Sequence, residues 1–171
     1  MDEARINAHL TTRVLIKRGF RVPIVTRITG LSAEIVRGVY REVTGRMAKP
    51  GPVPGPMSLV ETNRTRAATS LYLTFYARYA PDTQNVLDID WRAVVLAYDA
   101  YERIVPAELG ILGINSAWVA ATGFRSKTFE ISHCPKCHTE YVTCASYERR
   151  VYTSCPICAL QDRACRTKIV A

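Results

Sequence analysis

The 171-residue sequence contains no continuous apolar run near the roughly 18 residues that a membrane-spanning helix needs, so it predicts no helical membrane protein. It also contains no Walker-type glycine loop and no Gly-x-Ser-x-Gly motif, which mark two large classes of enzyme. Its three histidines lie in no recognised nucleophile or base motif. These absences predict that the protein is not an enzyme.

A secretory signal peptide is also missing, because the N-terminus, MDEARINAHL, is polar and carries two acidic residues. We therefore expect a cytoplasmic protein. Cysteines stay reduced in that compartment, so closely spaced cysteine pairs there more often bind a metal than form disulfides.

Acidic residues are the minority, with 15 Asp and Glu against 23 Lys and Arg, which gives a net charge of +8. Residues 1–49 carry a net charge of +6, residues 50–132 a net of −1 and residues 133–171 a net of +3. A basic end is either a solvated surface or a surface that binds a polyanion such as nucleic acid. Charge alone leaves both interpretations open.

Local signals predict a basic helical region over residues 1–48. Apolar side chains recur at helical spacing over residues 4–18, at Ile6, Leu10 and Val14. Pro23 can begin a second helix that ends at Gly30. Ser32 can cap a third helix that ends at Gly45.

Prolines at every second position from 50 to 56 forbid a helix and predict an extended strap over residues 49–57. Three helices are expected in the middle region, residues 58–125, which would form a core and contact a partner. Their predicted N-terminal caps are Ser58 with Glu61, Asp90 and Asn115. Their predicted ends are Arg78, Val105 and Gly123.

One of these helices carries an aromatic stripe with helical spacing, formed by Tyr72, Phe75, Tyr76 and Tyr79. Such a stripe could stack on nucleic-acid bases. Helical apolar stripes usually face a core or a partner, which is the interpretation that we favour. Beyond residue 125 the pattern changes to short β-type runs at residues 129–131, 140–142 and 151–153, which flank the cysteines.

The C-terminal region, residues 126–171, contains two Cys-x-x-Cys pairs, Cys134 with Cys137 and Cys155 with Cys158. The 17 residues between the pairs fall within the range of four-cysteine zinc sites. We expect the runs at 140–142 and 151–153 to form a hairpin that returns the second pair to the first. Four thiolates would fill a tetrahedral shell, so one zinc ion per chain would be structural rather than catalytic. A redox pair is the alternative, but the βαβ pattern that it needs is missing.

Basic side chains lie close to this region in the sequence. Arg149 and Arg150 fall near the tip of the expected hairpin, and the tail carries Arg163, Arg166 and Lys168. A hairpin held by zinc and edged with positive charge suits contact with DNA phosphates. Solvated charges are the alternative at each position.

Residues 22–41 have the pattern of a helix-turn-helix motif with Gly30 at the turn. The expected recognition helix would present Ser32, Arg37 and Arg41 outward, because the two arginines are four positions apart. Arginine can bind guanine through two hydrogen bonds or hold a phosphate. A solvated basic helix face is again the alternative.

The order of these features resembles the FlhC family, the zinc-binding subunit of the flagellar master transcriptional activator. The resemblance spans nearly the whole chain and is carried by GLSAEIVRGVYREVTG running into the prolines, AWVAATGF, CPKCHTEYV and CPIC. After the prolines, PGPVPGPMSLVETNRTR departs from flagellar members. This departure makes the chain at least as similar to divergent relatives from conjugative plasmids and integrative elements.

The resemblance implies a hetero-oligomer with a small helical partner, FlhD, that binds double-stranded promoter DNA. It further implies recruitment of RNA polymerase, which would switch on flagellar or conjugative-transfer operons. The four cysteines would be the ligands of a structural zinc ion, and the zinc-binding subunit would make most of the DNA contacts.

These patterns predict a mainly α-helical protein with a helix-turn-helix-like pair and a C-terminal four-cysteine hairpin resembling a zinc ribbon. Its expected function is that of the DNA-binding subunit of a heteromeric transcription activator. The alternative is a zinc-stabilised interaction or scaffold subunit that does not contact DNA. A nucleic-acid enzyme with a zinc ribbon is disfavoured because the sequence lacks the acidic cluster or nucleophile that it needs.

Overall fold

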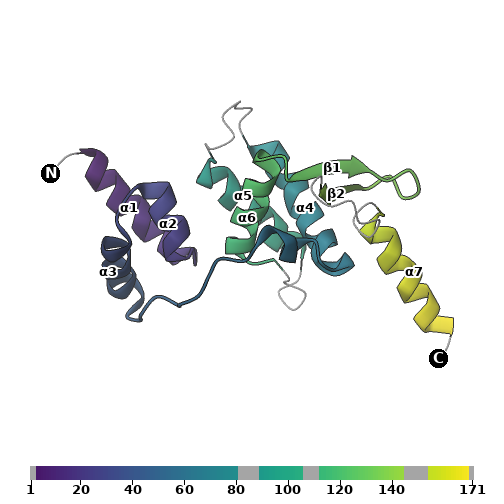
Figure 1. The fold of residues 1–171 in the computed structure, drawn as a ribbon, viewed down its shortest axis with the longest axis horizontal. Helices are drawn as coiled ribbons and strands as arrows, with labels where there is room; N and C mark the ends of the chain where they lie inside the picture. The colour runs from purple at the N-terminus through teal and green to yellow at the C-terminus, as the bar shows by residue number, and fades with distance from the viewer. Residues whose placement is uncertain (1–2, 81–88, 106–111, 145–153, 170–171) are drawn as a thin grey trace. The chain divides into compact units, whose positions relative to one another are not determined.

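A computed structural model of the chain describes residues 3–80, 89–105, 112–144 and 154–169, the last of these with side chains up to residue 162. The described residues form seven α-helices, one 3-10 turn and one two-stranded hairpin (Figure 1). The prediction of a mainly helical fold with a small C-terminal hairpin is confirmed. The chain divides into two compact units, Met1–Pro54 and Gly55–Ala171.

The first unit contains α1 (Glu3–Lys17), α2 (Val22–Thr29) and α3 (Ala33–Thr44), each packed against the other two. Their ends follow the predicted signals. Gly30 and Gly45 end α2 and α3 in the left-handed conformation, at φ of 70° and 66°. The Ser32 hydroxyl accepts a hydrogen bond from the Ile35 N–H at the start of α3, as expected for an N-cap.

The core of the first unit is formed by apolar side chains from all three helices and the first turn, namely Leu15, Ile16, Phe20, Ile24, Val25, Val36 and Val39. The apolar spacing predicted α1 correctly, but the residues that carry it are not in this core. Ile6, Leu10 and Val14 are exposed, while α1 is buried on its other face.

The proline strap between α3 and Pro56 contains no helix or strand, which agrees with the extended segment that the prolines predict. Arg21 holds the strap against the start of α2, since its guanidinium Nη1 donates to the carbonyl oxygens of Gly51, at 3.3 Å, and Pro52. The strap ends in the 3-10 turn Pro56–Leu59 of the second unit.

The second unit is organised around α4 (Asn63–Tyr79), which contacts α5 (Trp91–Ile104), α6 (Ile114–Arg125), strand β2 (Glu140–Cys144) and α7 (Pro156–Ile169). Tyr72 and Tyr76 of the aromatic stripe are buried. Tyr76 meets the Phe124 ring edge-on, with ring centroids 6.2 Å apart. The stripe therefore mainly builds the core, as expected, although Tyr79 at its end is exposed.

Two of the predicted helix caps are wrong. Helix α4 begins after Thr62, whose hydroxyl forms a reciprocal capping box with Thr65. Ser58 lies instead in the 3-10 turn, where its hydroxyl donates to the Gly55 carbonyl at 2.7 Å. A threonine pair four residues further on makes the same exchange of hydrogen bonds that the Ser58–Glu61 spacing predicted. The Asp90 cap of α5 is confirmed, because its carboxylate accepts from the Arg92 N–H at 2.8 Å.

Helix α6 is capped by Gly113 rather than by the Asn115 side chain, and it continues past Gly123 to Arg125. Gly123 is not a helix end. A Cβ atom at this position would lie 2.5 Å from the Phe129 ring, so glycine is needed where strand β1 (Phe129–His133) packs against the helix.

Strands β1 and β2 pair antiparallel, with Phe129 opposite Cys144 and His133 opposite Glu140. The strand at 140–142 is confirmed, but the partner predicted for it at 151–153 lies outside the described residues. Its observed partner is β1, only a short turn away.

Candidate metal centre

The turn between β1 and β2 carries the first cysteine pair. The Cys134 N–H donates to the Thr139 carbonyl at 3.0 Å, and the His138 N–H donates to the Cys134 carbonyl at 2.9 Å. His138 takes the left-handed conformation, at φ of 56°, that this tight turn requires. These constraints aim the sulfurs of Cys134 and Cys137 toward the same point.

The second cysteine pair opens helix α7. Pro156 is the first helical residue, a position where its missing N–H is tolerated, and the Ala159 N–H donates to the Cys155 carbonyl at 3.2 Å. Cys155 therefore lies just before the helix and Cys158 within its first turn. Burial raises the pKa of the Cys155 thiol, and hydrogen bonds from the backbone N–H groups of Cys158 and Ile157 offset only part of this increase.

The four sulfurs converge. The Sγ atoms of Cys134 and Cys158 are 3.8 Å apart, those of Cys137 and Cys155 are 3.6 Å apart, and all four lie within 4.8 Å of one another. These separations are too long for the roughly 2.05 Å bond of a disulfide. Zn–S bonds of about 2.3 Å around a tetrahedral ion place neighbouring sulfurs about 3.8 Å apart. The donor set therefore fits a metal ion that prefers thiolates.

The electrostatics of the cluster favour a cation. Hydrogen bonds from Thr139 lower the pKa of the Cys137 thiol to about 6. The hydrogen bond that Cys158 shares with Cys137 raises the pKa of the Cys158 thiol to about 12. The Cys137 thiolate thus holds the proton on Cys158, and all four sulfurs can ionise together only when a positive charge compensates them.

Helix α4 supports the cluster through two polar side chains. Arg66 is buried, donates from Nη2 to the Ser154 carbonyl at 2.6 Å, and lies over the Tyr141 ring with 6.0 Å from Cζ to the ring centroid. The Ser70 hydroxyl accepts from the Val142 N–H at 2.8 Å. Arg66 therefore holds the residue before the second cysteine pair, and Ser70 holds the strand after the first.

Sequence reasoning did not identify Arg66 or Ser70. A signal was present, because Arg66 falls in phase with Leu73, Thr69 and Ser70 on one buried face of the helix. A charged residue in phase with a buried face points to a partner group in the interior.

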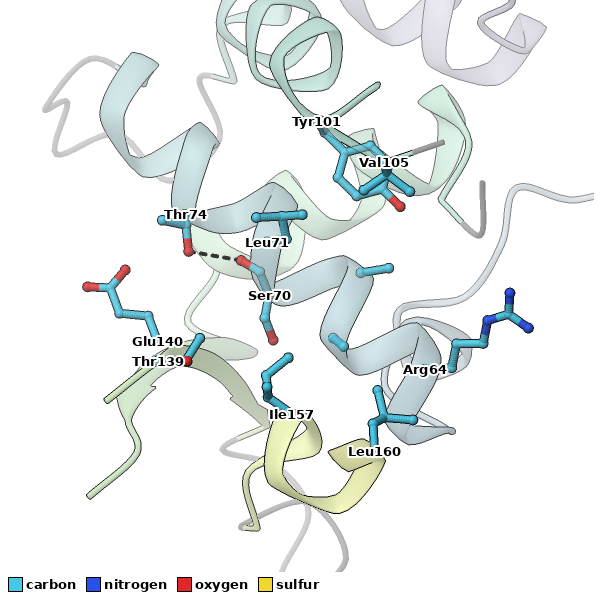
Figure 2. Close-up of a pocket in the computed structure, with 12 residues that line it drawn as sticks. Arg64, Ser70, Leu71, Thr74, Tyr101, Val105, Thr139, Glu140, Ile157 and Leu160 are labelled. Atoms are coloured by element: carbon cyan, nitrogen blue, oxygen red, sulfur yellow. Dashed lines mark hydrogen bonds between the residues drawn. The ribbon is translucent and has the colours of Figure 1, made fainter. Parts of the chain in front are cut away.

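An apolar pocket of about 460 Å³ lies in the second unit (Figure 2), and its lining includes Ile157, which precedes Cys158 in the sequence. It is lined by α4, by Tyr101 of α5 and Val105 just after that helix, by the hairpin, and by Ile157 and Leu160 of α7. The charged residues of its lining are Arg64 and Glu140. Such a lining can accommodate apolar groups but offers no nucleophile paired with a base.

The predicted DNA-binding residues fall in both units. Ser32, Arg37 and Arg41 are exposed on α3 of the first unit, as the pattern predicted. Arg149 and Arg150 lie outside the described residues. Three more, Arg163, Arg166 and Lys168, belong to α7 of the second unit, with side chains outside the described part.

Gly38 lies between the two arginines of α3. A Cβ atom there would meet no atom of the described chain within 4 Å, so packing inside the unit does not require glycine.

Of the described helices, none is both long enough and apolar enough to cross a membrane.

Comparison with known proteins places the chain in a family. The model of the flagellar transcriptional activator (FlhC) family matches residues 3–171. The flagellar transcriptional regulator FlhC of Nitrosomonas eutropha is 28% identical over 159 residues, which cover 92% of this chain and 81% of the relative. The regulator of the same name from Verminephrobacter eiseniae is 26% identical over 159 residues, or 91% and 83% of the two chains. The chain therefore belongs to the FlhC family of flagellar transcriptional activators.

Proposed function

We propose that this member of the FlhC family is the DNA-binding subunit of a hetero-oligomeric transcription activator in the bacterial cytoplasm. The observation that carries the proposal is the α2–turn–α3 pair, whose second helix exposes two arginines on one face. Family membership supports the role in transcription, and the exposed helix supports direct contact with DNA.

The proposed contact places α3 in the major groove, in the manner of a recognition helix. Arg37 and Arg41 would bind base edges or phosphates, and the exposed Ser32 at the N-cap would face the DNA backbone. Gly38 would let the backbone of the helix approach closely, which accounts for a glycine that no internal contact requires. The net charge of +6 over residues 1–49 would attract the polyanion.

The four cysteines, in this proposal, bind one structural zinc ion. Zinc prefers four thiolates in tetrahedral geometry, and the sulfur separations of 3.6 and 3.8 Å fit that geometry. A full shell of protein ligands leaves no position for water. The metal therefore stabilises the hairpin and the start of α7, and it positions the basic residues that flank them in the sequence.

The expected partner is a small helical subunit of the FlhD type, and the complex would recruit RNA polymerase. The relatives carry the name of flagellar regulators, so flagellar operons are the first candidates for its targets. Conjugative-transfer operons are the second candidates, because the segment after the prolines differs from that of flagellar members.

The test is the affinity of the purified complex of the chain with its partner for promoter DNA, measured over a range of salt concentrations. Several Lys and Arg contacts with phosphate predict that the logarithm of the affinity falls linearly with the logarithm of salt concentration, with a slope of about −0.9 per phosphate contacted. A complex that binds promoter DNA no better than a neutral protein of similar size would overturn the proposal.

A zinc-stabilised scaffold without DNA contact is the second candidate. The observation that favours it is the apolar pocket between α4, α5 and α7, which suits an apolar side chain from a partner. The same titration separates the two functions. A scaffold would assemble with the partner protein normally, yet would add nothing to the affinity of the complex for DNA.

A further inference from the structure

Helix α1 of the first unit carries an apolar stripe that its own unit does not cover. Leu10 is 57% exposed, Val14 46% and Ile6 39%, whereas Leu15 on the opposite face is fully buried. The three exposed side chains are four positions apart, so they lie along one face of the helix. A row of exposed apolar residues with this spacing is typical of a helix that packs against another helix.

Two charged residues flank the stripe, one at each end of α1. Glu3 lies in the first turn and Lys17 in the last, and both are exposed. Neither forms an ion pair within the described part of the chain. Arg13, which borders the same face, is already paired with Glu42 of α3 at 3.3 Å.

These positions are complementary to a second copy of the same helix running in the opposite direction. If Leu10 faces Leu10 of the other copy, then Ile6 faces Val14, and Glu3 faces Lys17. The Leu10 pair lies on the two-fold axis and occurs once, whereas the other two pairs each occur twice. A parallel arrangement would instead bring Glu3 against Glu3 and Lys17 against Lys17, and like charges across a helix pair repel.

We propose that α1 mediates self-association, pairing antiparallel with α1 of a second copy of this chain around Leu10. The charge pattern favours a second copy over a different protein, because the stripe and its flanking charges complement themselves without any further residue. Glu3 and Lys17 are 14 positions apart, so the contact spans about 21 Å at 1.5 Å per residue. A contact this short buries less than the roughly 1,200 Å² of a typical stable complex, so we expect weak, concentration-dependent association.

The experiment measures self-association of the full zinc-loaded chain by sedimentation equilibrium, without DNA and without any partner protein. Leu10→Glu should lower the association constant by about a hundredfold or more, because it places two carboxylates at the two-fold axis. Glu3→Lys and Lys17→Glu should each lower it about fivefold, because each puts like charges opposite one another at two places. The double variant Glu3→Lys with Lys17→Glu should restore the wild-type constant.

Leu96→Glu is the matched control, since Leu96 of α5 is also an exposed leucine on a helix, at 53% exposure. It should leave the association unchanged, and circular dichroism should show native helix content in every variant. A wild-type chain that stays monomeric, or a Leu10→Glu variant that associates normally, would overturn the proposal.

If the double variant Glu3→Lys with Lys17→Glu does not restore association, the proposed antiparallel pairing of α1 is also overturned. The same variants are then tested for binding to the helical partner protein. Loss of that binding with self-association intact would assign the stripe to the partner instead. None of these readouts involves DNA, so their failure is distinct from failure of the proposed function.

Discussion

Each of the two units of the chain is stabilised by a different kind of internal contact. In Met1–Pro54, three helices with local caps surround a small apolar core, and the side chains of Arg13 and Arg21 make exposed contacts with residues 29 and 30 positions away. In Gly55–Ala171, a buried arginine reaches a residue 88 positions away and a buried serine reaches one 72 positions away. Four cysteines from two distant segments complete the second unit.

This difference indicates that the two units depend on different interactions and have different roles. The first unit is specified by short sequence signals, and it presents the arginines proposed to contact DNA. The second unit needs contacts between distant segments, and a metal ion would supply the strongest of them. Experiments that remove metal, buried charge or backbone strain should therefore affect the two units unequally.

Metal removal should have the largest effect. Binding of a structural zinc contributes about 10–16 kcal/mol, which is comparable to the whole stability of a domain. Chelation, or Cys155→Ser, should abolish zinc binding and unfold the hairpin and α7. Hydrogen exchange followed by mass spectrometry should show lost protection in residues 129–144 and 154–169.

The same measurement contains its own control, because α1, α2 and α3 should keep their protection after chelation. Full protection of the hairpin in the presence of chelator would contradict the structural role of the metal.

The affinity for zinc should also fall as pH decreases, because protons compete for the thiolates. The Cys137 thiol, with its pKa lowered to about 6, should be the last to accept a proton.

Loss of the buried arginine should have the next largest effect. Arg66→Ala removes the hydrogen bond to Ser154 and leaves a cavity beside Tyr141, so we expect a loss of about 3 kcal/mol in urea unfolding of the zinc-loaded chain. The zinc affinity should fall about tenfold, because the residue before Cys155 loses its support. Arg64→Ala, two positions earlier and exposed, should change stability by less than about 0.5 kcal/mol. Equal effects of the two substitutions would contradict this role for Arg66.

Gly38→Ala should separate stability from function in the first unit. Nothing in the described chain fills the space at this position, and alanine is about 1 kcal/mol better than glycine inside a helix. The free energy of unfolding of the first unit, measured in urea, should therefore rise by about 0.5–1 kcal/mol. The affinity for DNA should fall at the same time if the backbone of α3 approaches it. A destabilised variant would show instead that the glycine serves packing.

His138→Gly should have the smallest effect. Glycine removes the strain of the left-handed conformation, which is worth about 1 kcal/mol. Its greater conformational freedom in the unfolded chain offsets this gain in stability. We expect a net change below about 0.5 kcal/mol in urea unfolding. His138→Val should destabilise by more than about 1 kcal/mol, because a β-branched residue adopts this conformation poorly. Equal stability of the two variants would argue against a tight turn at this point.

The sequence predicted the first unit well because its signals are local. Pro23, Gly30, Ser32 and Gly45 each act on the backbone within one helical turn, so no knowledge of the rest of the chain was needed. The same reasoning failed at Gly123, where a distant ring rather than a helix end requires glycine. It also did not show which face of α1 is buried, because two apolar rows share that helix.

In the second unit, the spacing of the cysteines was enough to predict that they gather. It was not enough to predict how the hairpin forms, because six residues separate β2 from β1 on one side and from residues 151–153 on the other, so sequence distance does not choose between the two partners. Arg66 and Ser70 could not be assigned either. Their partners, Ser154 and Val142, become neighbours only after α4 has packed against the hairpin.

The proposed contact of α3 with DNA is tested most directly by comparing the DNA affinity of two pairs of arginine substitutions in the complex with the helical partner. Arg37→Ala with Arg41→Ala removes two exposed charges from α3, and Arg78→Ala with Arg103→Ala removes two exposed charges from the second unit. The α3 pair should lower promoter affinity by at least about 30-fold, at 1–3 kcal/mol per residue, and reduce the salt slope, with unchanged thermal stability. The control pair should bind promoter DNA like wild type. Equal affinities for the two variants would contradict the account, because the recognition face would then lie elsewhere.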